Sequence, residues 1–220
     1  MKRSFKDLFI VFTVQIPNLK QPVMKKTVFL SALLLLIISL TSFSQSTKDE
    51  HATGLKPALL VIDIQNAYLQ MIPEKDKQMG LMYINALIDL FRSNGYPVIR
   101  IYHFDSKYGP KPDTEQFEFP SSVLIKPDDP KIIKTYGDGF NKTDLDKILK
   151  EKGCNTLFLC GLSAVGCVLA TWIGAQDHDY KAFMVKDAIM SHNSEYTDNV
   201  EVMFDAVGYE LVETVIQSTK

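Results

Sequence analysis

The chain lacks several features that would define a protein class. It has three cysteines, an odd number, so they cannot all pair in a disulfide framework, and we expect no structural disulfide. It contains no internal repeat. Beyond a basic N-terminal segment it is mildly acidic and has no basic stripe, which argues against nucleic acid as a partner. No Gly-x-Gly-x-x-Gly follows the first apolar run, so a flavodoxin-like or dinucleotide-binding function is poorly supported.

The N-terminal region has no apolar run of the length that spans a bilayer, about 20 residues. Residues 24–44 instead combine two lysines, an apolar run and a small-x-small ending, the three regions of a secretory signal peptide. An uncleaved anchor is the alternative, and the absence of a following cysteine excludes a lipid-modified N-terminus. We expect residues 1–23 to be an upstream extension missing from the mature protein, and residues 45–56 to be a polar leader. The mature protein is expected to be exported, periplasmic or secreted, with no stable membrane anchor.

From residue 57 onward, apolar runs alternate with segments of helical period. Six runs are predicted to be strands: 58–64, 97–104, 131–134, 156–160, 181–186 and 209–213. Four segments are predicted to be helices: 75–94, 143–153, 164–178 and 195–207. Residues 105–130 form a long loop, which is usually either functional or partly disordered. This order predicts an α/β domain over 57–216, with a doubly wound, mostly parallel sheet of about six strands and helices on both faces.

Reactive side chains occur where the predicted strands end, the edge at which doubly wound sheets bind ligands. Asp63 ends the first strand, Lys134 ends the third, and Cys167 opens the helix after the fourth. A helix N-terminus favours a thiolate, so Cys167 could be a nucleophile, with Asp63 as base and Lys134 as the charge-setting cation. Position alone leaves other roles open. A cysteine is often a small buried hydrophobe, a carboxylate can cap a loop, and a lysine at a strand end can lie on the surface.

Four stretches of the sequence resemble motifs of the isochorismatase-like cysteine hydrolases, in the family's order and over nearly the whole mature chain. They are ALLVIDIQNAY, IIKTYGDGFNKTDL, LFLCGLSAVGCVLAT and VKDA. The resemblance implies a catalytic triad of Asp63, Lys134 and Cys167. It also implies a cis peptide bond between Leu162 and Ser163, and a substrate oxygen bound by the backbone N–H groups of Ser163 and Cys167.

The function implied by the resemblance is hydrolysis of a small amide or ureido compound, with attack by Cys167 and a thioester intermediate. Two alternatives are a hydrolase-fold protein that binds a small molecule without turnover, and a vinyl ether hydrolase of the isochorismatase type. The second alternative is less favoured, because true isochorismatases need not use a cysteine nucleophile. No cofactor is expected, and a homo-oligomer is an open alternative to a monomer.

A metal site is not expected. The nicotinamidases of this family carry an Asp-x-His…His cluster after the second strand, whereas this chain reads HFDSKYGPKPDTEQ, with His103 and no second histidine. His103 is interpreted as a strand-end hydrogen-bonding residue, and lining of the pocket is the alternative. The substrate pocket is expected to be lined by Gln65, Tyr68, Tyr136, Phe140 and the 105–130 loop.

Overall fold

The central strand, β1 (Pro57–Ile62), is buried along its whole length. Its residues alternate between the two faces of the sheet, so Leu59 and Val61 belong to one core cluster while Leu60 and Ile62 belong to the other. A strand covered on both faces has no polar side, which explains the uninterrupted apolar run in the sequence.

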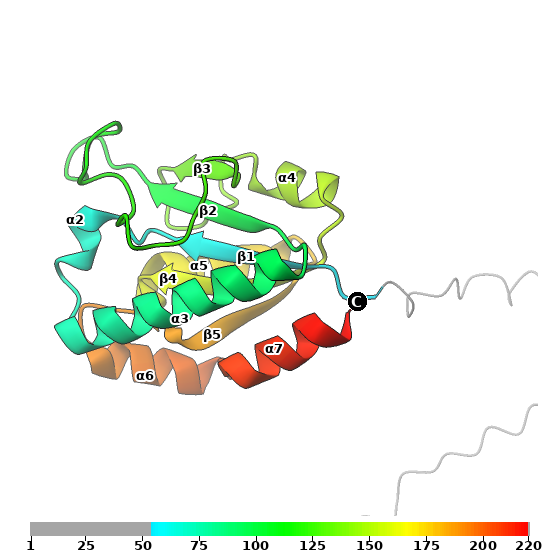
Figure 1. Ribbon diagram of the computed structural model, residues 1–220. Helices are drawn as coiled ribbons and strands as arrows, with labels where there is room; N and C mark the ends of the chain where they lie inside the picture. The colour runs from blue at the N-terminus through cyan, green and yellow to red at the C-terminus, as the bar shows by residue number, and fades with distance from the viewer. Residues whose placement is uncertain (1–53, 220) are drawn as a thin grey trace, which may run out of the picture. The chain divides into compact units, whose positions relative to one another are not determined.

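The computed structural model describes residues 54–219, in which five parallel strands lie in the order β3-β2-β1-β4-β5 (Figure 1). After β1, the strands are β2 (Val98–His103), β3 (Lys131–Lys134), β4 (Thr156–Leu162) and β5 (Lys181–Met190). The helices are α2 (Asn66–Leu69), α3 (Glu74–Ser93), α4 (Leu145–Glu151), η1 (Ala164–Val168), α5 (Leu169–Asp177), α6 (Ser194–Met203) and α7 (Tyr209–Ser218).

Helices cover both faces of this sheet. Buried residues of α3 and α7 belong to one core cluster, and buried residues of α4 and α5 belong to the other. The predicted doubly wound α/β architecture is therefore confirmed. The predicted upstream extension, the signal peptide and all but the end of the polar leader lie outside the described residues. Within residues 54–219, no helix has the length and apolar character needed to cross a membrane.

The sheet has five strands, one fewer than the sequence predicted. Residues 209–213, predicted to be the sixth strand, lie in α7, which starts after Gly208 and buries Val212 and Ile216 at helical spacing. A window of five residues is too short to show that period. In the described chain the sheet continues beyond β5 only as an isolated parallel bridge between Val185 and Val207.

The strand order reverses between β1 and β4, and their carboxyl ends lie very close together. Gly161 of β4 pairs with Ile62 of β1. Its φ is 113°, and a Cβ atom there would collide with the carbonyl oxygen of Ile62, so glycine is required. This close approach puts Asp63, the residue after β1, beside the segment that follows β4 and carries Cys167.

The long segment after β2 packs on the core of the protein. Phe117 and Phe119 are buried and stack on Tyr102 of β2, with ring centroids 5.4 Å and 4.2 Å from that of Tyr102. Two backbone hydrogen bonds join the same segment to the first turn of α2. The loop thereby fixes the short helix that carries Tyr68.

Candidate active site

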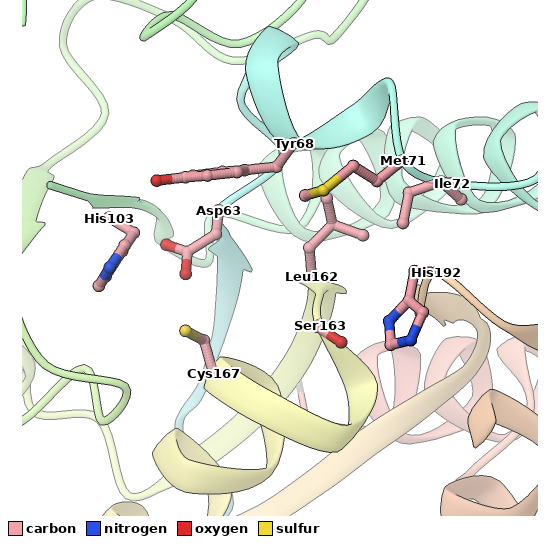
Figure 2. Close-up of a pocket in the computed structure, with 9 residues that line it drawn as sticks. All are labelled: Asp63, Tyr68, Met71, Ile72, His103, Leu162, Ser163, Cys167 and His192. Carbon is pink, nitrogen blue, oxygen red and sulfur yellow. The ribbon is translucent and has the colours of Figure 1, made fainter. Parts of the chain in front are cut away.

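The three residues of the proposed triad come together at the carboxyl ends of the strands. Lys134 Nζ donates a hydrogen bond to Asp63 Oδ2 at 2.7 Å, and the two side chains are 0% and 4% exposed. The Cys167 thiol points toward the same carboxylate (Figure 2). One side-chain ligand atom from each of Asp63, His103 and Cys167 lies within 4.8 Å of the other two.

Lys134 reaches the carboxylate because of the register of β3. This strand alternates exposed and buried residues, with Ile132 and Lys134 on the buried side, and Lys134 lies opposite His103 of β2. An unpaired ammonium in such a position would be strongly destabilising, because it loses its hydration. Asp63 supplies the partner, so the alternative of an exposed surface lysine is excluded.

Asp63 has one carboxylate oxygen that is not engaged. Its Oδ2 accepts the hydrogen bond from Lys134, whereas its Oδ1 is buried and has no hydrogen-bond partner among the described residues. Burial raises the pKa of Asp63 above its ordinary value, and attraction to the Lys134 ammonium opposes that rise. The backbone at Asp63 has a φ of 51°, in the left-handed region that few non-glycine residues adopt. The free oxygen and the uncommon backbone are both typical of a functional residue.

Cys167 lies in η1, a single π-helical turn that continues into α5. Gly166, just before it, has non-helical backbone angles. Burial, followed by the repulsion of the Asp63 carboxylate, raises the pKa of the Cys167 thiol to about 11. With this raised pKa the resting side chain is a thiol at neutral pH, in contrast to the thiolate that a position at a helix N-terminus favours.

The loop between β4 and Cys167 has a defined geometry. The peptide bond between Leu162 and Ser163 is cis, as the resemblance implied. The Ser163 carbonyl accepts hydrogen bonds from the backbone N–H groups of Gly166 and Val168. The Ser163 hydroxyl lies 3.2 Å from that of Ser191, the residue after β5. These contacts attach the loop both to η1 and to the end of the neighbouring strand.

A cavity of about 170 Å³ opens beside the thiol (Figure 2). It is lined by Asp63, Tyr68, Met71, Ile72, His103, Leu162, Ser163, Cys167 and His192. Tyr68 is the one of the four residues assigned to the pocket wall from the sequence that lines this cavity. The phenol of Tyr68 is partly buried and lies near the carboxylates of Asp63 and Asp105. Burial is the main cause, and these charges a further cause, that raise the pKa of Tyr68 to about 12.

The other three predicted wall residues, and the 105–130 loop, do not line this cavity. Gln65 is fully buried. Its side-chain amide donates to the His103 carbonyl oxygen at 3.1 Å and accepts from the His103 backbone N–H at 2.8 Å. Phe140 belongs to the core and stacks on His178, whereas Tyr136 is exposed and accepts a hydrogen bond from Lys142. All three follow strand ends, but that position does not determine the direction of a side chain.

Sequence reasoning missed Met71, Ile72 and His192. The first two follow α2, a helix of four residues that is too short to leave a periodic pattern. His192 lies two residues beyond β5, and the sequence placed the end of that strand near residue 186. A longer fifth strand would have been the signal for His192.

The residues around the thiol do not fit a resident metal ion. Asp63, His103 and Cys167 could each offer one ligand atom. The Lys134 ammonium, however, lies 2.7 Å from Asp63 Oδ2 and 3.4 Å from His103 Nδ1. Its positive charge, bonded to two of the three candidate ligands, would repel a metal cation.

All three cysteines of the chain are free thiols, as expected. Cys160 is buried, with its thiol 3.4 Å from the carbonyl oxygen of Leu60.

Comparison with known proteins identifies the family and the fold. The family model described as Isochorismatase domain matches residues 57–214. The uncharacterized isochorismatase family protein YrdC of Bacillus subtilis is 25% identical over 154 residues, which are 69% of this chain and 81% of that protein. The crystal structure of pyrazinamidase of Pyrococcus horikoshii in complex with zinc aligns with a TM-score of 0.58 at 26% identity, covering 68% of this chain and 94% of that one. N-carbamoylsarcosine amidase from Thermoplasma acidophilum shares the fold, with a TM-score of 0.60 at 24% identity over 70% of this chain and 95% of that one.

Proposed function

Because the chain belongs to the isochorismatase domain family, we propose that it is a cysteine hydrolase that cleaves the C–N bond of a small amide or ureido compound. The proposal depends on one observation: a thiol and a carboxylate with a free oxygen line one small cavity, and a buried ammonium is hydrogen-bonded to that carboxylate. The similarity to a pyrazinamidase supports an amide as the substrate. The size of the cavity supports a small molecule.

The first step is attack of the thiol on the substrate carbonyl. Lys134 holds Asp63 as a carboxylate, whose free Oδ1 accepts the Cys167 proton while Sγ bonds to the carbonyl carbon. Since the pKa of the thiol is raised to about 11, a thiolate does not accumulate beforehand, and proton transfer accompanies attack. The product of this step is a tetrahedral intermediate with a negatively charged oxygen.

Collapse of the intermediate and hydrolysis of the thioester complete the reaction. The backbone N–H groups of Ser163 and Cys167 bind the oxyanion, as the resemblance implied. Protonated Asp63 gives its proton to the leaving nitrogen, which departs as an amine or ammonia and leaves an acyl group on Cys167 as a thioester. Water then attacks the thioester carbonyl, Asp63 accepts a proton from that water, and the Cys167 sulfur leaves and recovers the proton from Asp63.

A screen of small primary amides and ureido compounds for ammonia release tests the proposal. Cys167→Ala should abolish release, and Asp63→Asn should lower the rate by about 10²–10⁴-fold because an amide cannot accept the proton. Cys154→Ala, a change at a cysteine in the loop before β4, is the matched control and should keep wild-type activity. Intact-protein mass spectrometry should detect an acylated wild-type enzyme during turnover.

Two results would contradict the proposal. One is a Cys167→Ala variant that hydrolyses a confirmed substrate at near wild-type rate. The other is turnover of a vinyl ether such as isochorismate with no turnover of any amide, which would favour the alternative hydrolase.

A further inference from the structure

The cavity has polar groups at both ends. One end holds Asp63 and Cys167, the groups that react. Beyond Leu162 and Ser163, on the side away from Cys167, the imidazole of His192 lines the same cavity (Figure 2). The wall between the two ends is mostly apolar and consists of Tyr68, Met71, Ile72 and Leu162. A molecule that fills the cavity therefore meets a reactive end, an apolar middle and a second polar end.

His192 is held in this position by the fold. In the register of β4 and β5, Leu162 lies opposite Met190, so the residues after Met190 run beside Ser163. The hydroxyl groups of Ser163 and Ser191 lie 3.2 Å apart and join the two segments. The ring of His192 also packs edge-on against Tyr196, with the ring centroids 5.4 Å apart. The same strand pairing that places the nucleophile loop thus places the imidazole.

The charges along the cavity favour an oxygen acceptor beside His192. Asp63 is the one carboxylate among the described lining residues, it lies at the reactive end, and Lys134 is paired with it. An imidazole always carries at least one N–H donor, and it carries two donors and a positive charge when protonated. An anionic or carbonyl oxygen at the far end would therefore meet a donor and no opposing carboxylate of the cavity wall.

We infer that His192 is a specificity-determining residue that binds a carboxylate or carbonyl oxygen at the end of the substrate remote from the scissile amide. The substrate class is then a short monoamide of a dicarboxylic acid, with an apolar spacer that contacts Leu162 and Ile72. The inference rests on the proposed function for the identity of the reacting end. Binding at the far end does not depend on turnover and can be measured separately.

Steady-state kinetics on matched substrates test the inference. The probes are the monoamides malonamate, succinamate and glutaramate, each compared with the unbranched alkyl amide of the same chain length. His192→Ala should raise KM about tenfold for the preferred acid amide, the loss expected for one hydrogen bond to a charged group, with kcat nearly unchanged. The KM for alkyl amides should not change. His192→Gln keeps an N–H donor and should recover part of the loss, and Tyr196→Phe should behave as the wild type.

Calorimetry separates this inference from the proposed reaction. Succinamate and the other acid amides are titrated into Cys167→Ala, which cannot turn over, and into the double variant with His192→Ala. If the wild type hydrolyses no amide but the single variant binds an acid amide about tenfold more tightly than the double variant, the proposed reaction fails and the His192 subsite stands. Equal binding by the two variants, or no binding by either, overturns the inference. The inference is also overturned if His192→Ala raises KM for acid amides and for alkyl amides to the same extent.

Discussion

Nδ1 of His103 lies 3.4 Å from Nζ of Lys134. An ammonium can only donate, so His103 accepts through Nδ1 and its neutral ring carries the proton on Nε2. Burial, and then the positive charge of Lys134, lower the pKa of His103, which favours this neutral form. The lysine therefore bonds a carboxylate and a neutral imidazole at once, and it is held between the ends of β1 and β2.

The buried pair of Asp63 and Lys134 should reveal itself in stability. Asp63→Asn removes the negative charge and leaves Lys134 buried without a counter-charge, so we expect the free energy of unfolding to fall by about 3–5 kcal/mol. The double variant Asp63→Asn/Lys134→Met removes both charges and should recover most of that loss, while remaining inactive. Urea unfolding and the hydrolysis assay together measure this. A double variant that is less stable than Asp63→Asn would show that the pair does not carry the cost we assign to it.

Alkylation of Cys167 should depend on pH in the way expected for a raised pKa. The thiolate reacts and the thiol does not, so the rate with iodoacetamide should rise about tenfold per pH unit and not level off before the pKa of about 11. Asp63→Asn removes a charge that raises this pKa, so it should speed alkylation near neutral pH. Peptide mapping identifies the modified cysteine, with Cys167→Ala as the blank. A wild-type rate that is already constant below about pH 8 would contradict the neutral resting thiol.

Gly161→Ala should damage both the fold and the site. The new Cβ would meet the Ile62 carbonyl oxygen, and the backbone φ of 113° is unfavourable for alanine, so we expect destabilisation of at least about 1–3 kcal/mol. The separation of β1 and β4 should also move Asp63 from Cys167 and lower kcat. Gly137→Ala is the control, because its Cβ would lie at an ordinary 3.5 Å from Ala170. Thermal unfolding and kinetics of the two variants give the comparison, and equal behaviour would rule out the close approach as the cause.

Gln65 should behave as a structural clamp and not as a substrate-binding residue. Gln65→Ala leaves the backbone N–H and carbonyl of His103 without their partners, which should cost about 1–3 kcal/mol of stability for each group left buried. Gln65→Glu can still accept from the His103 N–H but cannot donate to its carbonyl, so it should lie between alanine and the wild type. KM should change little in either variant. A large rise in KM with unchanged stability would instead indicate that Gln65 contacts the substrate.

The sequence located the site better than it described the pocket. Asp63, Lys134 and Cys167 could be found because the carboxyl ends of parallel strands share one edge, and a reactive side chain there is conspicuous after an apolar run. The direction of a side chain at that edge depends on tertiary packing, which is why Gln65 and Phe140 were assigned to the wall although they lie in the interior.

The far end of the pocket was missed for a different reason. Asp187 adopts a φ of 61°, and the register of β4 and β5 shifts between Leu159 and Gly161. Together these irregularities let β5 continue to Met190 past a charged residue that resembles a strand end in the sequence. The position of His192 follows from that continuation, whose one sign in the sequence is the apolar run 188–190 after Asp187.

The distance along the chain between two of the proposed catalytic groups has a consequence for folding. Asp63 and Lys134 are 71 residues apart in sequence, and parallel pairing through β2 is what brings them together. Such non-local pairing forms slowly, after the local structure of helices such as α3. Until the sheet closes, Cys167 has neither its base nor the burial that suppresses its ionisation, so a newly made chain carries an ordinary thiol. Recovery of the proposed hydrolysis during refolding should therefore lag behind recovery of helical circular dichroism, so that activity would report on the last stage of assembly.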